Sequence, residues 1–112
     1  MKKENSSEVK EILKCAVELE RYFINYIDKV IPKNKWNWLI EKSIWIEELV
    51  GLLFAKGIIS QSKYDQIRAV AAGLTSSIEF PYHQEDCIYN YMLVNSAASV
   101  IRELTKLYKT MT

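Results

Sequence analysis

Apolar residues recur at intervals of three and four along nearly the whole chain, and this spacing constrains the fold more than any other feature. Such intervals place the apolar side chains on one face of an α-helix. No stretch of four or more residues shows the alternation that is typical of a half-buried β-strand. In the first segment the repeating positions are Val9, Ile12, Ala16, Leu19, Phe23, Tyr26 and Val30. The sequence therefore predicts an all-α fold.

Residues that cap or break helices divide the first half of the chain into two helices. Asn5 and Glu8 have the spacing of a capping box, in which each side chain satisfies a free backbone N–H of the first turn. Pro32 ends the first helix because a residue that precedes proline avoids the α region. Asn34 or Asn37 is the expected cap of the second helix. The first two helices are therefore expected at about residues 6–31 and 36–56.

The turn after the second helix carries a specific set of signals. Gly57 suits the left-handed residue that follows a helix, and Ile58 is placed to contact Leu53 as in a Schellman ending. Ser60 is the expected cap of the third helix, which a Phe-Pro pair ends. The last two helices are expected at about residues 61–79 and 84–109.

The apolar positions also predict which face of each helix is buried. Apolar residues cover more than half of the circumference of the second helix, and we expect Trp38 and Trp45 in its core face and Trp36 to be exposed. The expected buried positions of this helix are Trp38, Leu39, Trp45, Ile46, Leu49, Val50, Leu52 and Leu53. Those of the third and fourth helices are Tyr64, Ile67, Ala71, Leu74 and Ile78, then Val94, Ala97, Ile101, Leu104, Tyr108 and Met111, flanked by Leu93, Val100 and Leu107.

Chain length and turn length together predict the architecture. The 112 residues match the size of one domain. Turns of a few residues between consecutive amphipathic helices force neighbouring helices to run antiparallel. We therefore expect residues 1–112 to form a single domain, a four-helix bundle with up-down-up-down topology.

Composition narrows the location and the class of partner. The 15 Lys and Arg against 14 Asp and Glu give a net charge of +1, whereas proteins that bind nucleic acid by neutralising phosphates usually carry a basic excess. The first residues lack the apolar segment of a signal peptide, and the longest apolar stretch, Leu49–Ala55, is shorter than a membrane span. Two cysteines, Cys15 and Cys87, are too few for a disulfide framework. These features predict a cytoplasmic protein with reduced thiols and with neither a membrane nor a nucleic-acid partner.

No residue pattern in the sequence predicts catalysis, a cofactor or a metal site. His83 is the one histidine, and Cys87 alone accompanies it at helical spacing, whereas a zinc site usually needs about four ligands. No serine or cysteine nucleophile stands at a recognisable spacing from His83, and no glycine-rich phosphate loop is present. The sequence therefore favours a protein that is not an enzyme.

One end of the expected bundle concentrates aromatic and charged residues. In an up-down topology the first and third loops lie at the same end, so residues near 33–38 and 80–86 come together. Tryptophan, tyrosine and mixed charge are typical of surfaces that bind proteins. The alternative is that the basic first loop and the acidic third loop pair with each other and close the bundle. The candidate partner-binding residues are Lys33, Lys35, Trp36, Trp38, Tyr82, His83, Glu85 and Asp86.

These observations favour a protein that acts by binding another protein. The most specific hypothesis is an immunity or inhibitor protein that neutralises a bacterial toxin by covering its active or docking surface, which is an analogy at the level of protein class. One alternative is a nucleic-acid-associated accessory or regulatory protein of a plasmid or phage, acting through the hairpin of the second and third helices. Another is a structural homo-oligomeric adaptor, such as a homodimer, in which a second subunit covers the apolar surplus of the second helix.

Overall fold

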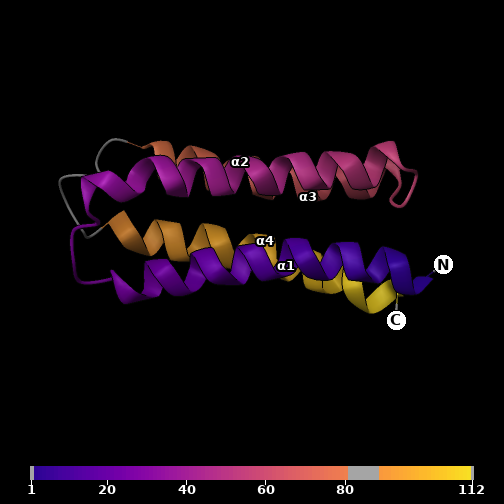
Figure 1. Cartoon of the computed structure of the whole chain (residues 1–112), viewed down its shortest axis with the longest axis horizontal. Helices are drawn as coiled ribbons and strands as arrows, with labels where there is room; N and C mark the ends of the chain where they lie inside the picture. The colour runs from indigo at the N-terminus through magenta and orange to yellow at the C-terminus, as the bar shows by residue number, and fades with distance from the viewer. Residues whose placement is uncertain (1, 81–88, 112) are drawn as a thin grey trace.

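The computed structural model describes residues 2–80 and 89–111, with side chains from residue 6 onward. These residues form four helices: α1 (Lys2–Asn25), α2 (Lys33–Ala55), α3 (Gln61–Glu79) and α4 (Asn90–Met111). The helices lie side by side in an elongated body whose Cα extents are 45 × 20 × 20 Å (Figure 1). The prediction of an all-α four-helix bundle is confirmed.

The helices are connected in an up-down-up-down order. Helix α1 packs against α2 and α4, and α3 packs against α2 and α4, so the four helices form a closed ring of neighbours. The end of α1, the start of α2, the end of α3 and the start of α4 lie at one end of the body, and the α2–α3 turn lies at the other (Figure 1). This topology is the predicted one.

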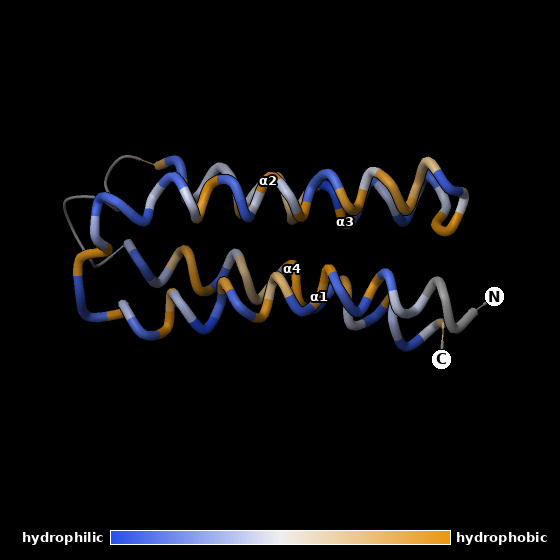
Figure 2. Tube along the Cα trace, in the orientation of Figure 1, coloured by the Kyte–Doolittle hydropathy of each residue, from blue (hydrophilic) through white to orange (hydrophobic). Residues whose placement is uncertain are grey.

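Each helix buries a narrow stripe of about one side chain per turn. Figure 2 shows the alternation of apolar and polar positions along the helices that creates these stripes. On α1 and α3 the stripes fall where the spacing predicts them, on Val9, Ile12, Ala16, Leu19 and Phe23, and on Ile67, Ala71, Leu74 and Ile78. On α4 the fully buried positions are Leu93, Ala97, Val100, Leu104 and Leu107, so most of the predicted seam lies beside the stripe and is only partly buried.

The buried stripe of α2 differs from the prediction. Trp36 is 4% exposed, whereas Trp38 is 39% and Trp45 is 51% exposed, the reverse of the expected arrangement. Ser43 occupies the stripe because its hydroxyl donates a hydrogen bond to the Ile40 carbonyl over 2.8 Å and so remains satisfied when buried. The buried positions of α2 are Trp36, Leu39, Ser43, Ile46, Val50 and Leu53. A helix that is apolar over more than half of its circumference can turn more than one side toward the core. Contact with the neighbouring helices selects the side that is buried here.

The ends of α1 and α2 also differ from the prediction. Helix α1 begins at Lys2 and ends at Asn25, because the chain then turns through backbone hydrogen bonds that join residues three apart. Val30, expected on the buried face, is therefore exposed, and Ile31 is buried in its place. Helix α2 begins at Lys33 with Pro32 as its N-cap, so neither predicted asparagine cap is used. Of the predicted fourth helix, residues 84–88 lie outside the described residues.

The α2–α3 turn has the predicted Schellman geometry. Gly57 has a φ of 76°, and its N–H donates to the Phe54 carbonyl over 2.9 Å. The N–H of Ile58 donates to the Leu53 carbonyl over 2.9 Å, which completes the motif. The Ser60 hydroxyl accepts from the Lys63 N–H over 3.2 Å, and α3 begins and ends at the predicted residues.

Polar contacts join α3 to each of its two neighbouring helices. The Thr75 hydroxyl on α3 donates to the Glu47 carboxylate on α2 over 2.7 Å. The Ser77 hydroxyl on α3 and the Ser96 hydroxyl on α4 lie 2.8 Å apart. Such contacts add little net free energy each, but they match only in one register of the helices.

We expect Gly57→Ala to lower the free energy of unfolding by about 1 kcal/mol, because a side chain is strained at positive φ. Gly73→Ala is the matched control, since Gly73 lies inside α3 and no atom lies within 4 Å of an added Cβ. That variant should be more stable than the wild type by up to about 1 kcal/mol. Urea unfolding measures both; equal effects at the two positions would contradict the turn geometry.

Candidate functional site

The structure describes only half of the predicted partner-binding end. Lys33 and Lys35 are exposed in the first turn of α2, Trp38 is partly exposed, and Trp36 is buried in the core. The other four predicted residues, Tyr82, His83, Glu85 and Asp86, lie outside the described residues. The predicted pairing of the two loops is therefore untested, and Trp36 is removed from the exposed surface.

Asn90 joins α4 to the α1–α2 turn at this end. Its side-chain Nδ2 donates to the Tyr26 carbonyl over 2.7 Å and to the Lys29 carbonyl over 2.8 Å. The side chain is fully buried, and its Oδ1 has no hydrogen-bond partner among the described residues. Both carbonyls lie just beyond α1, so the amide replaces partners that the helix no longer provides. The sequence offered no signal for this contact, since a single asparagine at a helix start is usually a surface cap.

Replacing Asn90 with alanine should lower the free energy of unfolding by about 1–3 kcal/mol, because the carbonyls of Tyr26 and Lys29 each lose the hydrogen bond from the Asn90 amide. Asn95→Ala on the exposed side of α4 is the control and should change it by less than about 0.5 kcal/mol. Chemical denaturation of the two variants gives the comparison. Similar stabilities would show that Asn90 does not hold the α1–α2 turn.

Aromatic rings cluster between α1 and α2 near the same end. The Tyr22 ring stacks on Tyr26 with centroids 4.9 Å apart and packs against Trp38 at 5.6 Å. The Lys42 ammonium lies 5.3 Å from the centroid of the Trp38 ring, within the range of a cation–π contact. Lys42 also forms an ion pair of 2.7 Å with Glu18 of α1. These contacts hold Trp38 in place while leaving part of its ring exposed.

The Tyr22 hydroxyl lies inside this cluster. Burial of the hydroxyl, followed by the interaction with the Tyr26 side chain, raises the pKa of Tyr22 to about 12. The folded protein therefore holds the Tyr22 proton more tightly than the unfolded chain, whose tyrosines ionise near a pKa of about 10. The corresponding contribution to stability is present below about pH 10 and is lost as the pH rises toward about 12.

We expect Tyr22→Phe to reduce the loss of stability between about pH 10 and pH 12 relative to the wild type. Tyr91→Phe is the control, because the Tyr91 side chain is exposed on α4. Unfolding midpoints in denaturant at several alkaline pH values test the expectation. If Tyr22→Phe and wild type lose stability in parallel, the Tyr22 hydroxyl is not held in its neutral form by the fold.

Three large apolar side chains extend this exposed surface along α2. Trp38, Trp45 and Leu52 follow one another at intervals of seven residues and are 39%, 51% and 49% exposed. Because seven residues make nearly two helical turns, they form a row along one side of the helix. The row borders the α1–α2 boundary, which the Glu18–Lys42 pair and a Glu8–Lys56 pair of 3.1 Å bridge. We call the row and these two ion pairs the α1/α2 face.

A hollow of about 280 Å³ opens beside Leu52 on this face. Its apolar walls come from Ile12, Leu49, Leu52 and Leu53, and its rim carries Glu8, Glu11 and Lys56. The volume is large enough for an apolar side chain of a partner but small for a drug-sized ligand. The α1/α2 face therefore combines a ridge of exposed rings with a recess.

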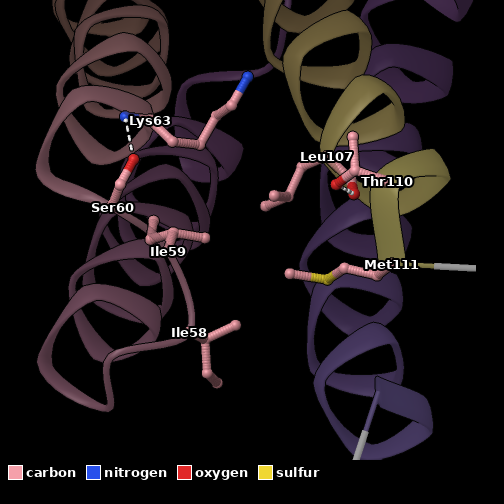
Figure 3. Close-up of a pocket in the computed structure, with 7 residues that line it drawn as sticks. All are labelled: Ile58, Ile59, Ser60, Lys63, Leu107, Thr110 and Met111. Carbon is pink, nitrogen blue, oxygen red and sulfur yellow. Dashed lines mark hydrogen bonds between the residues drawn. The ribbon is translucent and has the colours of Figure 1, made fainter.

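A second hollow lies near the same end of the bundle, between the α2–α3 turn and the last turn of α4. Ile58, Ile59, Leu107 and Met111 supply its apolar wall (Figure 3). Its hydroxyl groups are engaged within the protein, since Ser60 caps α3 and Thr110 donates to the Leu107 carbonyl over 2.7 Å. The remaining polar group, the Lys63 ammonium, extends away from Ile58 (Figure 3). This hollow offers apolar contact and a single charge.

In residues 2–80 and 89–111, no three residues among His, Cys, Asp and Glu are grouped to hold a metal ion, and His83 and Cys87 lie outside this range. Burial raises the pKa of the Cys15 thiol, which faces the α1–α2 boundary near Lys42. Within the same residues, none of the helices is both long and apolar enough to cross a membrane.

Comparisons with protein-family models, with curated proteins and with solved structures found no match to this chain. A function for this chain is therefore inferred from its own geometry. Two of the exposed aromatic rings in the described part of the chain, Trp38 and Trp45, lie one behind the other on the α1/α2 face. The sequence predicts both rings in the core. They are exposed because packing in the bundle fixes which side of α2 faces solvent.

Proposed function

We propose that this protein acts by binding another protein through the α1/α2 face. The observation that carries the proposal is the row of Trp38, Trp45 and Leu52, each more than one-third exposed on a helix that already buries another stripe in the core. Tryptophan is the residue most enriched among those that dominate the binding energy of protein interfaces. A contiguous apolar patch of this kind marks an interaction site more often than scattered surface residues do.

The rigidity of the face supports the same function. Trp38 is held by Tyr22 and Lys42, and Lys42 is held in turn by Glu18, so the ring is already ordered before a partner arrives. Ordering side chains on binding costs about 0.5–1.5 kcal/mol for each flexible residue. A preordered aromatic anchor avoids part of this cost.

The most specific form of the proposal is that the partner is a bacterial toxin and that this chain is its immunity or inhibitor protein. An inhibitor of this kind acts by steric occlusion, with the row of α2 as anchor and the charged residues around it as rim. The toxin-inhibitor form adds a requirement that binding alone does not: equimolar addition of this chain must abolish the partner's activity.

Site-specific photo-crosslinking tests the binding function. A photoreactive residue at position 45 should join the chain to a partner in the cell, whereas the same residue at the exposed position 102 on α4 should not. The crosslinked protein is then purified and titrated with wild type and with Trp45→Ala. We expect Trp45→Ala to weaken the complex by at least about 2 kcal/mol, the usual cost of truncating a central tryptophan.

Two outcomes contradict the proposal. Equal crosslinking from positions 45 and 102 would show that the α1/α2 face has no special role. Recovery of nucleic acid in place of protein, with an affinity that falls steeply as salt is added, would favour the accessory-protein alternative. Circular dichroism of each variant establishes that the bundle is intact.

A further inference from the structure

The charges beside the apolar row are not evenly mixed. Glu41 and Glu48 are exposed on α2 and, at 3.6 residues per turn, lie within about 60° of the row on the side away from α1. Neither carboxylate forms an ion pair with any described residue. The row is therefore bordered along its outer side by two uncompensated negative charges.

The other border of the row carries charges of both signs, and most of them are paired. Across the α1–α2 boundary, α1 presents Glu11 and Glu18, both exposed. Lys42 and Lys56 also lie here, but each is already paired, with Glu18 and Glu8 respectively. Glu11 lines the hollow beside Leu52. On this border Glu11 is an acidic residue without an ion pair among the described residues, and Lys35, three residues before Trp38, is a basic one. The negative charge beside the row therefore comes mainly from Glu41 and Glu48.

The shape of the face matches one secondary-structure element. The row from Trp38 to Leu52 spans about 21 Å, which is about four turns of helix. It is straight, narrow and parallel to the groove between α1 and α2, with a recess of about 280 Å³ at one end. A single amphipathic helix presents a stripe of that width and length, with one large side chain free to enter the recess.

From these features we propose that the α1/α2 face binds an amphipathic helix of a partner protein whose apolar stripe is flanked by lysine and arginine. The inference rests on the proposed protein-binding function and names the chemistry of the partner. The apolar stripe packs on Trp38, Trp45 and Leu52, and the basic flanks meet Glu41 and Glu48 on one side and Glu11 on the other. Complementary charge of this kind selects the partner and speeds its association.

A second copy of this chain fits the face less well. Two α2 helices packed antiparallel through this row bring the Glu41 and Glu48 border of one copy against that of the other, which places like charges together. Helix α1 of a second copy offers the cations Lys10, Lys14 and Arg21 on its outer side. However, Ile24 is the one large apolar side chain exposed on the described part of α1. Leu13 and Val17 on the same side are half-buried and line a hollow of about 790 Å³, so α1 offers less exposed apolar surface than the row.

Two model peptides of about 20 residues provide the probe. Both carry leucine at helical spacing of three and four, and the leucine stripe is flanked by lysine in one peptide and by glutamate in the other. Isothermal titration calorimetry at low ionic strength should give at least tenfold tighter binding of the lysine peptide, about the effect expected from several charge contacts. Added salt should reduce this difference.

Variants locate the binding on the α1/α2 face. Glu41→Lys with Glu48→Lys should reverse the preference, so that the glutamate peptide binds more tightly. Asp65→Lys with Glu79→Lys on α3 changes the net charge by the same amount at exposed positions and should leave the preference for the lysine peptide in place. Trp45→Ala should weaken binding of the lysine peptide by at least about tenfold.

Each other outcome overturns the inference in a distinguishable way. Equal or tighter binding of the glutamate peptide to the wild type, or no binding of either peptide, rejects a basic helix as the partner; crosslinking from position 45 then decides separately whether the face binds protein. Peptide binding that survives Trp45→Ala places the site elsewhere. A concentration-dependent dimer that Trp45→Ala abolishes assigns the face to a second copy.

Discussion

A helix in a four-helix bundle can bury about one side chain per turn, and this limit determines the rest of the structure. The bundle is 20 Å across in both short directions, so each helix contributes one narrow stripe to the core. Helices α1 and α3 carry about as many apolar residues as such a stripe needs. Helix α2 carries more, and the surplus is exposed, as Trp38, Trp45 and Leu52 in the row and as Ile44 and Phe54 outside it. The candidate docking surface thus results from the small number of side chains that one helix of the bundle can bury.

Polar contacts decide which arrangement of the four helices is adopted. Apolar stripes can slide past one another at modest cost, whereas a buried polar group needs its partner at a particular position. Asn90 donates hydrogen bonds to two backbone carbonyls, and Thr75 donates one to Glu47. The hydroxyls of Ser77 and Ser96 form a hydrogen bond with each other. These contacts are distributed over different pairs of elements, so together they define one register for the bundle. The register of the helices therefore determines where the exposed row of α2 lies.

Much of the fold was predictable from the sequence because its signals are local. The left-handed Gly57, the Ser60 cap and the intervals of α3 each depend on a few neighbouring residues. The end of α1 was missed because Pro32 restricts only the residue before it, and the chain leaves the helix several residues earlier. The phase of α2 was missed because Trp36, Trp38 and Trp45 are equally apolar, and only packing against α1 and α3 distinguishes them.

The candidate site was predicted less well than the fold for the same reason. The end of the bundle near Lys33 and Trp38 was found from topology, which depends only on loop order. The row that continues to Leu52 depends on which side of α2 faces outward, and the contact of Asn90 depends on a distant turn. Neither is encoded in the spacing of a single segment.

The unequal burial of the tryptophans gives the protein a built-in optical reporter. Trp36 is enclosed in the core, Trp38 lies beneath an ammonium group, and Trp45 faces solvent. The surroundings of their indole rings therefore differ in polarity. A soluble quencher reaches the rings in a fixed order that begins with Trp45. A change at the surface of this bundle and a change in its core therefore alter the fluorescence of different tryptophans in the unlabelled chain.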